Sequence, residues 1–405
     1  MSGIASLPEK LANLDEAARA DVARVLRIKA LEGGEYEVPE PFRSKVARWC
    51  GGASDAGAAA SDAWTKVLGQ RVISVHGIWT YETSNFNPLR TLRPVAGPMA
   101  STAGPDAVAS ACAGPGKCDF CDAERLTVVE PFGRVQGRHS LTAGNVFKSA
   151  GVHGLVIWSR HEPHLLTQEE VTDGFRTADE WFDRAAGLEI PEGGGDCYPM
   201  MFWNCFRNAG ASQVHPHMQL QLFPEPVALG AMLREQGARY IREAKGGRDL
   251  CRDVARAHQH LGLAMDVAGA SCWASLTPRV GGGELCVLGP AAAPDLGHRP
   301  RLANVAAAVG AALRALRRCR AESYSVLGCL VPTNAGEAWL VRCSHRGALD
   351  TAVVDAAAGE LMGLASVGAD PYAMYEALQA EVRKGDAFAE KPLETVATSQ
   401  RKVEA

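Results

Sequence analysis

The stretch from Asn204 to Gln219 reads NCFRNAGASQVHPHMQ, and it places polar side chains at alternate positions, on His215, His217 and Gln219. In a β-strand, residues two apart lie on the same face of the sheet. Burying two imidazoles side by side costs free energy unless they bind something. Pro216 removes a backbone donor, so we expect this strand at a sheet edge or at a bulge. The polar row predicts a functional site.

A second motif, CDFC at Cys118 to Cys121, places two thiols on one tight turn. Such a turn is a common half of a zinc site, although redox motifs use the same spacing. The apolar segment from Gly154 to Trp158 predicts a strand, and His161 and His164 follow it. Two thiols and several histidines together favour a metal site.

The two motifs resemble the galactose-1-phosphate uridylyltransferase branch of the histidine-triad (HIT) superfamily, whose signature is His-Pro-His-x-Gln. Ser212 and Asn204 lie three and eleven residues before the first histidine, as in that family. The chain also keeps the order C-x-F-C, apolar strand, histidine and HPH. The resemblance implies zinc as cofactor, with ligands at Cys118, Cys121, His161 and His215. His164 is a rival for the third ligand position.

The resemblance also implies roles for the polar residues. The superfamily cleaves a phosphoanhydride by attack of a histidine nitrogen, so His217 is the expected nucleophile, with Gln219 and Ser212 as the other catalytic residues. An amide can donate to a phosphate oxygen but is not a general base, which favours transfer over hydrolysis. The residues that the resemblance places near the substrate are Asn204, Gly210, Arg90, Arg93 and Asn145.

Three functions stay open at this point. The preferred one is a hexose-1-phosphate uridylyltransferase, such as one for galactose 1-phosphate, which exchanges a UDP-sugar with a sugar 1-phosphate. The flanking GASQ and LQL also look like dinucleoside-polyphosphate phosphorylases, so the second is a phosphorylase or adenylyltransferase acting on a dinucleoside polyphosphate, GDP-hexose or adenylyl sulfate. The third is a catalytically retired subunit of an assembly. Met218 and Val214 depart from the usual glycine and proline of the sugar-specific enzymes, which puts galactose 1-phosphate in doubt.

Composition fits a soluble enzyme. The 405 residues are 47% hydrophobic and 22% charged, with a formal net charge of -4. We therefore expect phosphate-bearing small molecules as partners, with no nucleic acid and no membrane, and a homodimer stays open. Twelve scattered cysteines indicate reduced thiols in a cytoplasmic protein. An N-terminal amphipathic helix over 11–30 contains acidic residues, so import into an organelle is not favoured but stays open.

The expected fold class is α+β: a HIT-like fold of two HIT-type modules, the second degenerate, with antiparallel sheets flanked by helices. The pattern divides the chain into an N-terminal helical arm, a catalytic domain, a second HIT-like domain and a flexible tail, at 1–70, 71–228, 229–390 and 391–405. A capping box at Thr167 and Glu170 predicts a helix over 167–186. Strands are expected at 128–132, 155–158, 200–203 and 214–222, and a mobile loop at 96–116. His258 and His260 are expected on a solvated helix face.

Overall fold

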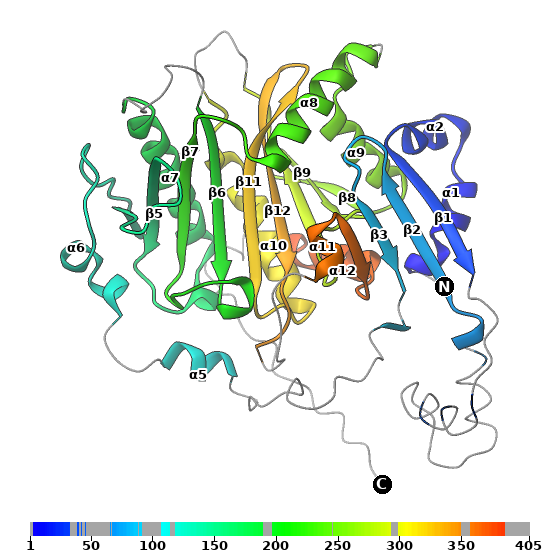
Figure 1. Cartoon of the computed structure of the whole chain (residues 1–405), viewed down its shortest axis with the longest axis horizontal. Coiled ribbons are helices and arrows are strands. Elements are labelled where there is room, and N and C mark those ends of the chain that lie inside the picture. The colour runs from blue at the N-terminus through cyan, green and yellow to red at the C-terminus, as the bar shows by residue number, and fades with distance from the viewer. Residues whose placement is uncertain are drawn as a thin grey trace.

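The computed structural model describes residues 3–32, 67–87, 89–90, 107–113, 118–188, 197–244, 246–292, 299–349 and 357–384, together with residues 39, 42, 45 and 65. Nine strands form one sheet in the order β4-β5-β7-β6-β11-β12-β10-β9-β8, and all neighbours in it are antiparallel (Figure 1). In chain order these strands are β4 Ser140–Gly144, β5 Val152–Trp158, β6 Tyr198–Cys205, β7 His217–Phe223, β8 Ala264–Val267, β9 Ala270–Ala274, β10 Glu284–Leu288, β11 Tyr324–Thr333 and β12 Gly336–His345.

The sheet contains the same pattern twice. In the first half two strands, the helix α7 (Gln168–Ala185) and two further strands follow one another as β4, β5, α7, β6 and β7. In the second half β9, β10, α10 (Ala306–Arg318), β11 and β12 repeat that order. The halves join where β6 pairs with β11, so one sheet runs through both. The antiparallel sheet flanked by helices confirms the predicted α+β class with two modules.

Helix α7 begins as the sequence predicts. The Thr167 side chain accepts from the backbone N–H of Glu170, whose carboxylate accepts in return from the N–H of Thr167. The apolar side of α7 packs on the sheet, where Trp158 of β5 donates its indole N–H to the backbone oxygen of Glu170 at 2.7 Å. Trp158 also packs against Trp203 of β6. These buried rings fix the position of β5 and β6 against the helix.

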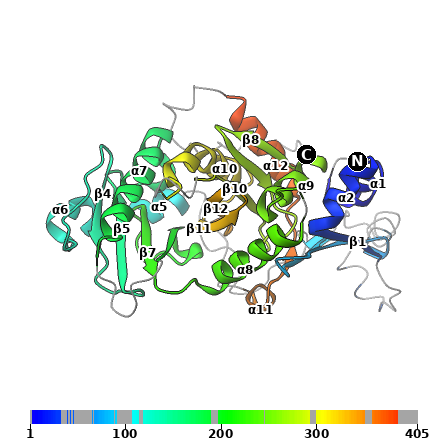
Figure 2. The same cartoon turned by 90° about the horizontal axis from the view of Figure 1, so that it is seen from above.

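The helices cover the two faces of the sheet unequally. Figure 2 shows α7 and α10 on one side of the sheet and α8 (Ala228–Glu243) on the other. Helix α9 (Leu250–His260) and helix α12 (Pro371–Val382) complete the second half. On β6 the side chains of Met201 and Trp203 are buried against the helices, whereas Phe202 and Asn204 on the opposite face are half-exposed. The face away from α7 is therefore the accessible one in the first half.

A second, four-stranded sheet lies beside the second half, in the order β1-β2-β3-β13. Its strands are β1 Leu26–Glu32, β2 Arg71–Gly77, β3 Thr83–Phe86 and β13 Leu364–Val367, and β13 runs parallel to β3. The prediction of one helix over 11–30 is wrong. Short helices, α1 (Leu7–Ala12) and α2 (Glu16–Val25), come first, and the chain then turns into β1 because it pairs with β2.

Several other local predictions are corrected. Residues 128–132 form no strand, although Val128 accepts one hydrogen bond from Gly144 of β4. The region 96–116, expected as a loop, contains the helix α5 (Ala107–Ala113). Strand β7 lies between β5 and β6 and not at an edge, and Pro216 precedes it. His258 is buried and not solvated, since its ring bonds to the backbone of Val254 and Leu276.

Two further short α-helices are α6 at Ala123–Leu126 and α11 at Ala358–Leu361. Among the described residues, no helix has the length and apolar character that crossing a bilayer requires.

Candidate functional site

Four side chains from separate parts of the chain meet at the end of β5. They are Cys118, Cys121, His161 and His215, and their ligand atoms lie within 4.8 Å of one another. Nδ1 of His215 lies 3.6 Å from Sγ of Cys118 and 3.5 Å from Sγ of Cys121. Nδ1 of His161 lies 3.3 Å from both Sγ of Cys121 and Nδ1 of His215. This is the set that the resemblance to the uridylyltransferases implied.

These separations suit a tetrahedral metal centre. With metal–sulfur bonds of about 2.3 Å and metal–nitrogen bonds of about 2.1 Å, adjacent ligand atoms lie roughly 3.4–3.8 Å apart. The measured contacts fall close to that range. Burial is the largest cause that raises the pKa of the Cys121 thiol, and the neighbouring Cys118 thiol adds to it. A bound cation would offset this rise, because it stabilises the thiolate. The donor set therefore fits a divalent metal that accepts two thiolates and two imidazoles.

The backbone orients both imidazoles. Nε2 of His215 is 2.6 Å from the backbone oxygen of Trp158, at the end of β5, and Nε2 of His161 is 3.1 Å from that of Cys112, in α5. With Nε2–H donating to a carbonyl, Nδ1 keeps its lone pair and faces the cluster. Burial is the main reason that the pKa of His215 falls to about 4, so this ring is neutral and available as a ligand at neutral pH.

His164 is not part of this cluster. Its ring is buried between Phe206 and Tyr324, and its Nε2 bonds to the backbone oxygen of Glu322 at 2.7 Å. Burial lowers the pKa of His164 to about 3. The structure therefore places His161, and not His164, beside the two thiols.

His217 is the first residue of β7 and its side chain is buried. Nδ1 lies 2.9 Å from the backbone oxygen of His215 and, as a donor to that carbonyl, leaves Nε2 with the lone pair. Burial lowers the pKa of His217, which keeps the ring neutral. Phe120, inside the CDFC turn, packs edge-on against the His217 ring with centroids 5.2 Å apart. The CDFC turn thus contacts the His217 ring through Phe120.

The accessible face of the sheet continues the polar row. Gln219 lies opposite Phe202 in the β6–β7 ladder, and Asn204 is the next residue of β6 on the same face, towards His217. Met218 points to the other face, where it is fully buried. Its departure from the family's glycine therefore places nothing in the site.

The connection between β6 and β7 contains a short 3-10 helix, Arg207–Ala209, which is terminated at Gly210. Gly210 has φ +87°, a left-handed conformation that glycine adopts without strain, and a side chain there would approach the Asn204 amide. Ser212 follows on an exposed segment. The structure thus brings Asn204, Gly210 and Ser212 to the end of the sheet at which His217 lies.

The other predicted substrate residues are placed differently. Arg90 is exposed and follows β3, a strand of the four-stranded sheet. Arg93 lies outside the described residues. Asn145 has its amide engaged inside the β4–β5 loop: Oδ1 accepts from the N–H of Phe147, and Nδ2 contacts His153. Contacts of these three residues with a nucleotide stay predictions.

Sequence reasoning missed His153. It lies on β5 with 2% exposure, directly opposite Gln221, and its Nε2 is 2.8 Å from Oε1 of Gln219. The signal was present, since a histidine two residues before Leu155 shares a strand face with it. The strand was expected to begin only after His153, so its alternation was not extended to that residue.

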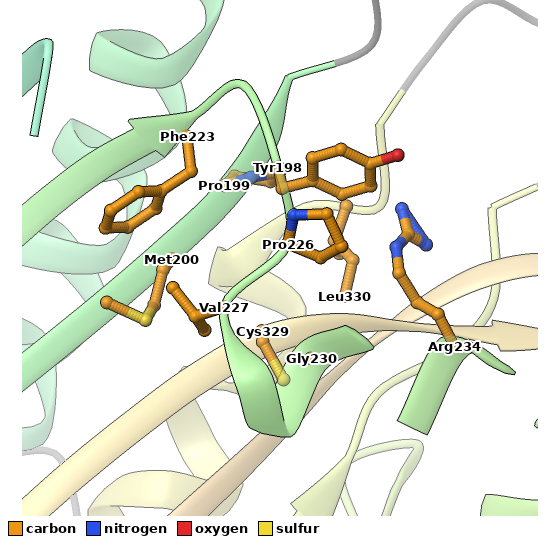
Figure 3. Close-up of a pocket in the computed structure, with 10 residues that line it drawn as sticks. All are labelled: Tyr198, Pro199, Met200, Phe223, Pro226, Val227, Gly230, Arg234, Cys329 and Leu330. Atoms are coloured by element: carbon orange, nitrogen blue, oxygen red, sulfur yellow. The ribbon is translucent and has the colours of Figure 1, made fainter. Parts of the chain in front are cut away.

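A pocket opens at the other end of β6 and β7. Figure 3 shows the ring of Tyr198, the Phe223 ring and Pro226 around it, with the Arg234 guanidinium at one side. The guanidinium lies 4.7 Å from the centre of the Tyr198 ring and pairs with the Glu337 carboxylate. The pocket lining is mostly apolar and includes none of the predicted site residues.

Solved structures with this architecture exist, whereas no family model and no curated protein matches the sequence. An ADP-glucose phosphorylase from Arabidopsis thaliana, solved with bound ADP-glucose, superposes with a TM-score of 0.53 at 15% identity, over 74% of this chain and 95% of that one. A mutant uridylyltransferase superposes with a TM-score of 0.50 at 17% identity, over 67% of this chain and 93% of that one. The chain shares the HIT-like fold of these two enzymes.

Proposed function

We propose that the protein transfers a nucleotidyl group from a nucleoside diphosphate sugar to a phosphate-bearing acceptor, through a nucleotidyl-histidine intermediate on His217. The observation that carries this proposal is the orientation of the His217 ring. Its Nδ1–H is held on the backbone oxygen of His215, so the lone pair of Nε2 is the one available for attack.

In the first step Nε2 of His217 attacks the α-phosphorus of the donor. The N–P bond forms while the P–O bond to the β-phosphate breaks, and the electron pair leaves with the sugar phosphate. The positive charge that develops on the ring is stabilised by the His215 carbonyl. In the second step a phosphate oxygen of the acceptor attacks the same phosphorus, and Nε2 departs with its electron pair. The cycle consumes no base.

Gln219 suits this chemistry better than hydrolysis. A sugar phosphate leaves without protonation, so the site needs no general acid. The Gln219 amide can donate to a nonbridging phosphate oxygen, whereas it cannot deprotonate water. Ser212 and the backbone around Gly210 are the groups proposed to bind the charge that develops on the phosphate.

We propose zinc as the metal, because two thiolates and two imidazoles are its common ligand set. Cys118, Cys121, His161 and His215 would hold it. When bound, the ion supplies positive charge and a rigid junction between the CDFC turn, β5 and the HPH segment. The chain's own residues then fix the nucleophile: the Phe120 ring and the His215 carbonyl both contact the His217 side chain.

Uridylyl exchange between a UDP-sugar and a hexose 1-phosphate is the preferred reaction. The HPH motif and the CDFC turn support it, and the fold is similar to that of a uridylyltransferase. The similarly folded ADP-glucose phosphorylase makes inorganic phosphate the acceptor to compare against hexose 1-phosphate.

The test separates donor from acceptor. The protein is offered UDP-glucose, ADP-glucose, GDP-mannose or diadenosine tetraphosphate, each labelled in the α-phosphate, and the covalent intermediate is isolated. Its discharge is then timed with water, inorganic phosphate and galactose 1-phosphate. We expect labelling by UDP-glucose and discharge by galactose 1-phosphate faster than by water. Discharge by inorganic phosphate alone would move the assignment to a phosphorylase, and discharge by water at an equal rate would refute transfer.

A further inference from the structure

The Gln219 amide is not free to rotate, because β5 holds one end of it. Nε2 of His153 lies 2.8 Å from Oε1 of Gln219. A second glutamine of β7 is held nearby: Gln221, two residues after Gln219, donates to Oγ of Ser149 at 2.6 Å. The Gln219 side chain is thus joined to β5, and the Gln221 side chain to the β4–β5 loop.

The hydrogen bonds of His153 determine which of its nitrogens carries the proton. The backbone N–H of Ser149 points at Nδ1 over 3.1 Å, so Nδ1 must be an acceptor. In the neutral ring Nε2 is then the donor, and burial, which lowers the pKa of His153, favours the neutral ring.

Only one neighbour can accept that proton well. The Asn145 Nδ2 atom is 3.1 Å from Nε2, but Oδ1 of Asn145 is already bonded to the N–H of Phe147, so the amide presents its NH2 group to His153. Oε1 of Gln219 is the acceptor that remains among the described contacts of Nε2. The Asn145 NH2 group already faces Nε2–H as a donor. A flipped Gln219 amide would add a second donor and leave Nε2–H without an acceptor among these contacts, which costs free energy.

We infer that His153 is a positioning residue, which fixes the Gln219 amide with its oxygen inward and turns its NH2 group towards the bound α-phosphate. The inference rests on the proposed function. In this arrangement the Gln219 amide can only donate to the substrate. His153, on the neighbouring strand, determines that orientation of the amide.

The kinetic test is a double-mutant cycle on formation of the intermediate in a single turnover. His153→Leu should slow formation by about 10–100-fold, as removal of the partner that orients a metal ligand does in metal sites. In the Gln219→Met background, the same change should cost little, because there is no amide left to orient. His153→Gln, whose side-chain NH2 can replace the Nε2 donor, should recover part of the rate.

A buried histidine elsewhere supplies the control. His258 bonds through both ring nitrogens to the backbone, as a purely structural group would. His258→Leu should lower the melting temperature without slowing formation of the intermediate. If His153→Leu lowered the rate by the same factor in both Gln219 backgrounds, or left it unchanged with Gln219 present, the positioning role would be wrong.

A second measurement does not depend on the reaction. In nitrogen-15 NMR spectra of the ligand-free protein, His153 should show the tautomer protonated at Nε2, and His153→Leu should shift the Gln219 side-chain amide signals. A ring protonated at Nδ1 would overturn the inference even if the kinetics agreed. A wild-type protein that forms no intermediate with any donor would refute the proposed function, while these spectra would still decide the pairing of His153 with Gln219.

Discussion

The two halves of the large sheet share one pattern of strand pairing, but the paired polar side chains are accessible in the first half and buried in the second. In the first half, His153 of β5 faces Gln221 of β7 and bonds to Gln219, two residues earlier on β7. The Gln219 side chain is half-exposed on the accessible face. A polar row in this half is therefore left open to a ligand.

In the second half, Glu284 of β10 faces Ser344 of β12 and bonds to Arg342, two residues earlier on β12. Both halves thus contain a side chain that faces one residue of the next strand and bonds to the residue two positions earlier. In the second half, however, Glu82, from the segment before β3, reaches the Arg342 guanidinium at 2.7 Å and closes the face. All of these charged groups are buried.

The comparison indicates that one copy of the repeated pattern offers polar groups to a ligand, whereas the other uses them for contacts inside the protein. A neutral pair at these positions leaves hydrogen-bonding capacity for a phosphate. The Arg342 guanidinium instead donates to two carboxylates and to the backbone oxygen of Thr277, inside the protein. We therefore regard the first half as the chemical half and the second half as its structural counterpart.

The largest effect should come from the nucleophile. His217→Ala should reduce nucleotidyl transfer by more than about 10³-fold without unfolding the chain, because no other group replaces Nε2. His217→Gly should regain activity with a nucleoside 5′-phosphorimidazolide, which carries its own imidazole. In the second half, Leu340→Ala, at a buried position of β12, should lower stability while each folded molecule keeps its activity. Undiminished turnover in His217→Ala would contradict the account.

Removing the metal ligands should come next. Purified protein should contain about one zinc per chain. Changing Cys118 and Cys121 to Ser should abolish it and reduce the free energy of unfolding by several kcal/mol, because metal binding is coupled to folding. Cys112→Ser is the matched control, since that residue contributes only its backbone oxygen to the site and should retain the metal. Metal-free protein of full stability would exclude a structural role for the ion.

Breaking the buried ion cluster should affect stability alone. Arg342→Met leaves the Glu82 and Glu284 carboxylates without their cation, and we expect a loss of about 3–5 kcal/mol in the free energy of unfolding. Urea denaturation measures this, and the transfer rate per folded molecule should stay the same. A variant that folds normally but forms the intermediate more slowly would show that the second half takes part in the chemistry.

The smallest effect is a dependence of stability on pH. Burial lowers the pKa of His258 to about 4 and that of His164 to about 3. Below about pH 6.5 the unfolded chain binds a proton at each histidine and the folded chain does not, so stability falls as pH falls from there towards 4. The slope should approach about 1.4 kcal/mol per pH unit for each histidine. In His258→Phe the slope, measured by urea denaturation, should be shallower; an unchanged slope would mean that His258 is not buried as a neutral ring.

Local signals explain what the sequence could predict. Helix α7 was predictable because Thr167 and Glu170 form its capping box and a regular apolar stripe follows. The HPH and CDFC motifs were expected to belong to one site because their order along the chain resembles that of the uridylyltransferases. The metal cluster brings these two segments together as the resemblance implied.

Contacts between distant segments explain what it could not. Residues 26–32 have a charged, helix-like pattern and become β1 only because β2 pairs with them. The choice between His161 and His164 depends on Glu322, a residue 158 positions away that binds the His164 ring. Strand β7 could not be placed in the middle of the sheet from Pro216, because the proline lies just outside the ladder.

The central claim is that His217 carries the nucleotidyl group, and peptide mapping tests it most directly. The protein is incubated with a labelled UDP-sugar in the absence of acceptor, digested at alkaline pH, where a phosphoramidate is stable, and analysed by mass spectrometry. We predict a single uridylyl adduct on Nε2 of His217, lost on mild acid treatment. An adduct on any other residue, or turnover with no adduct at all, would contradict the account.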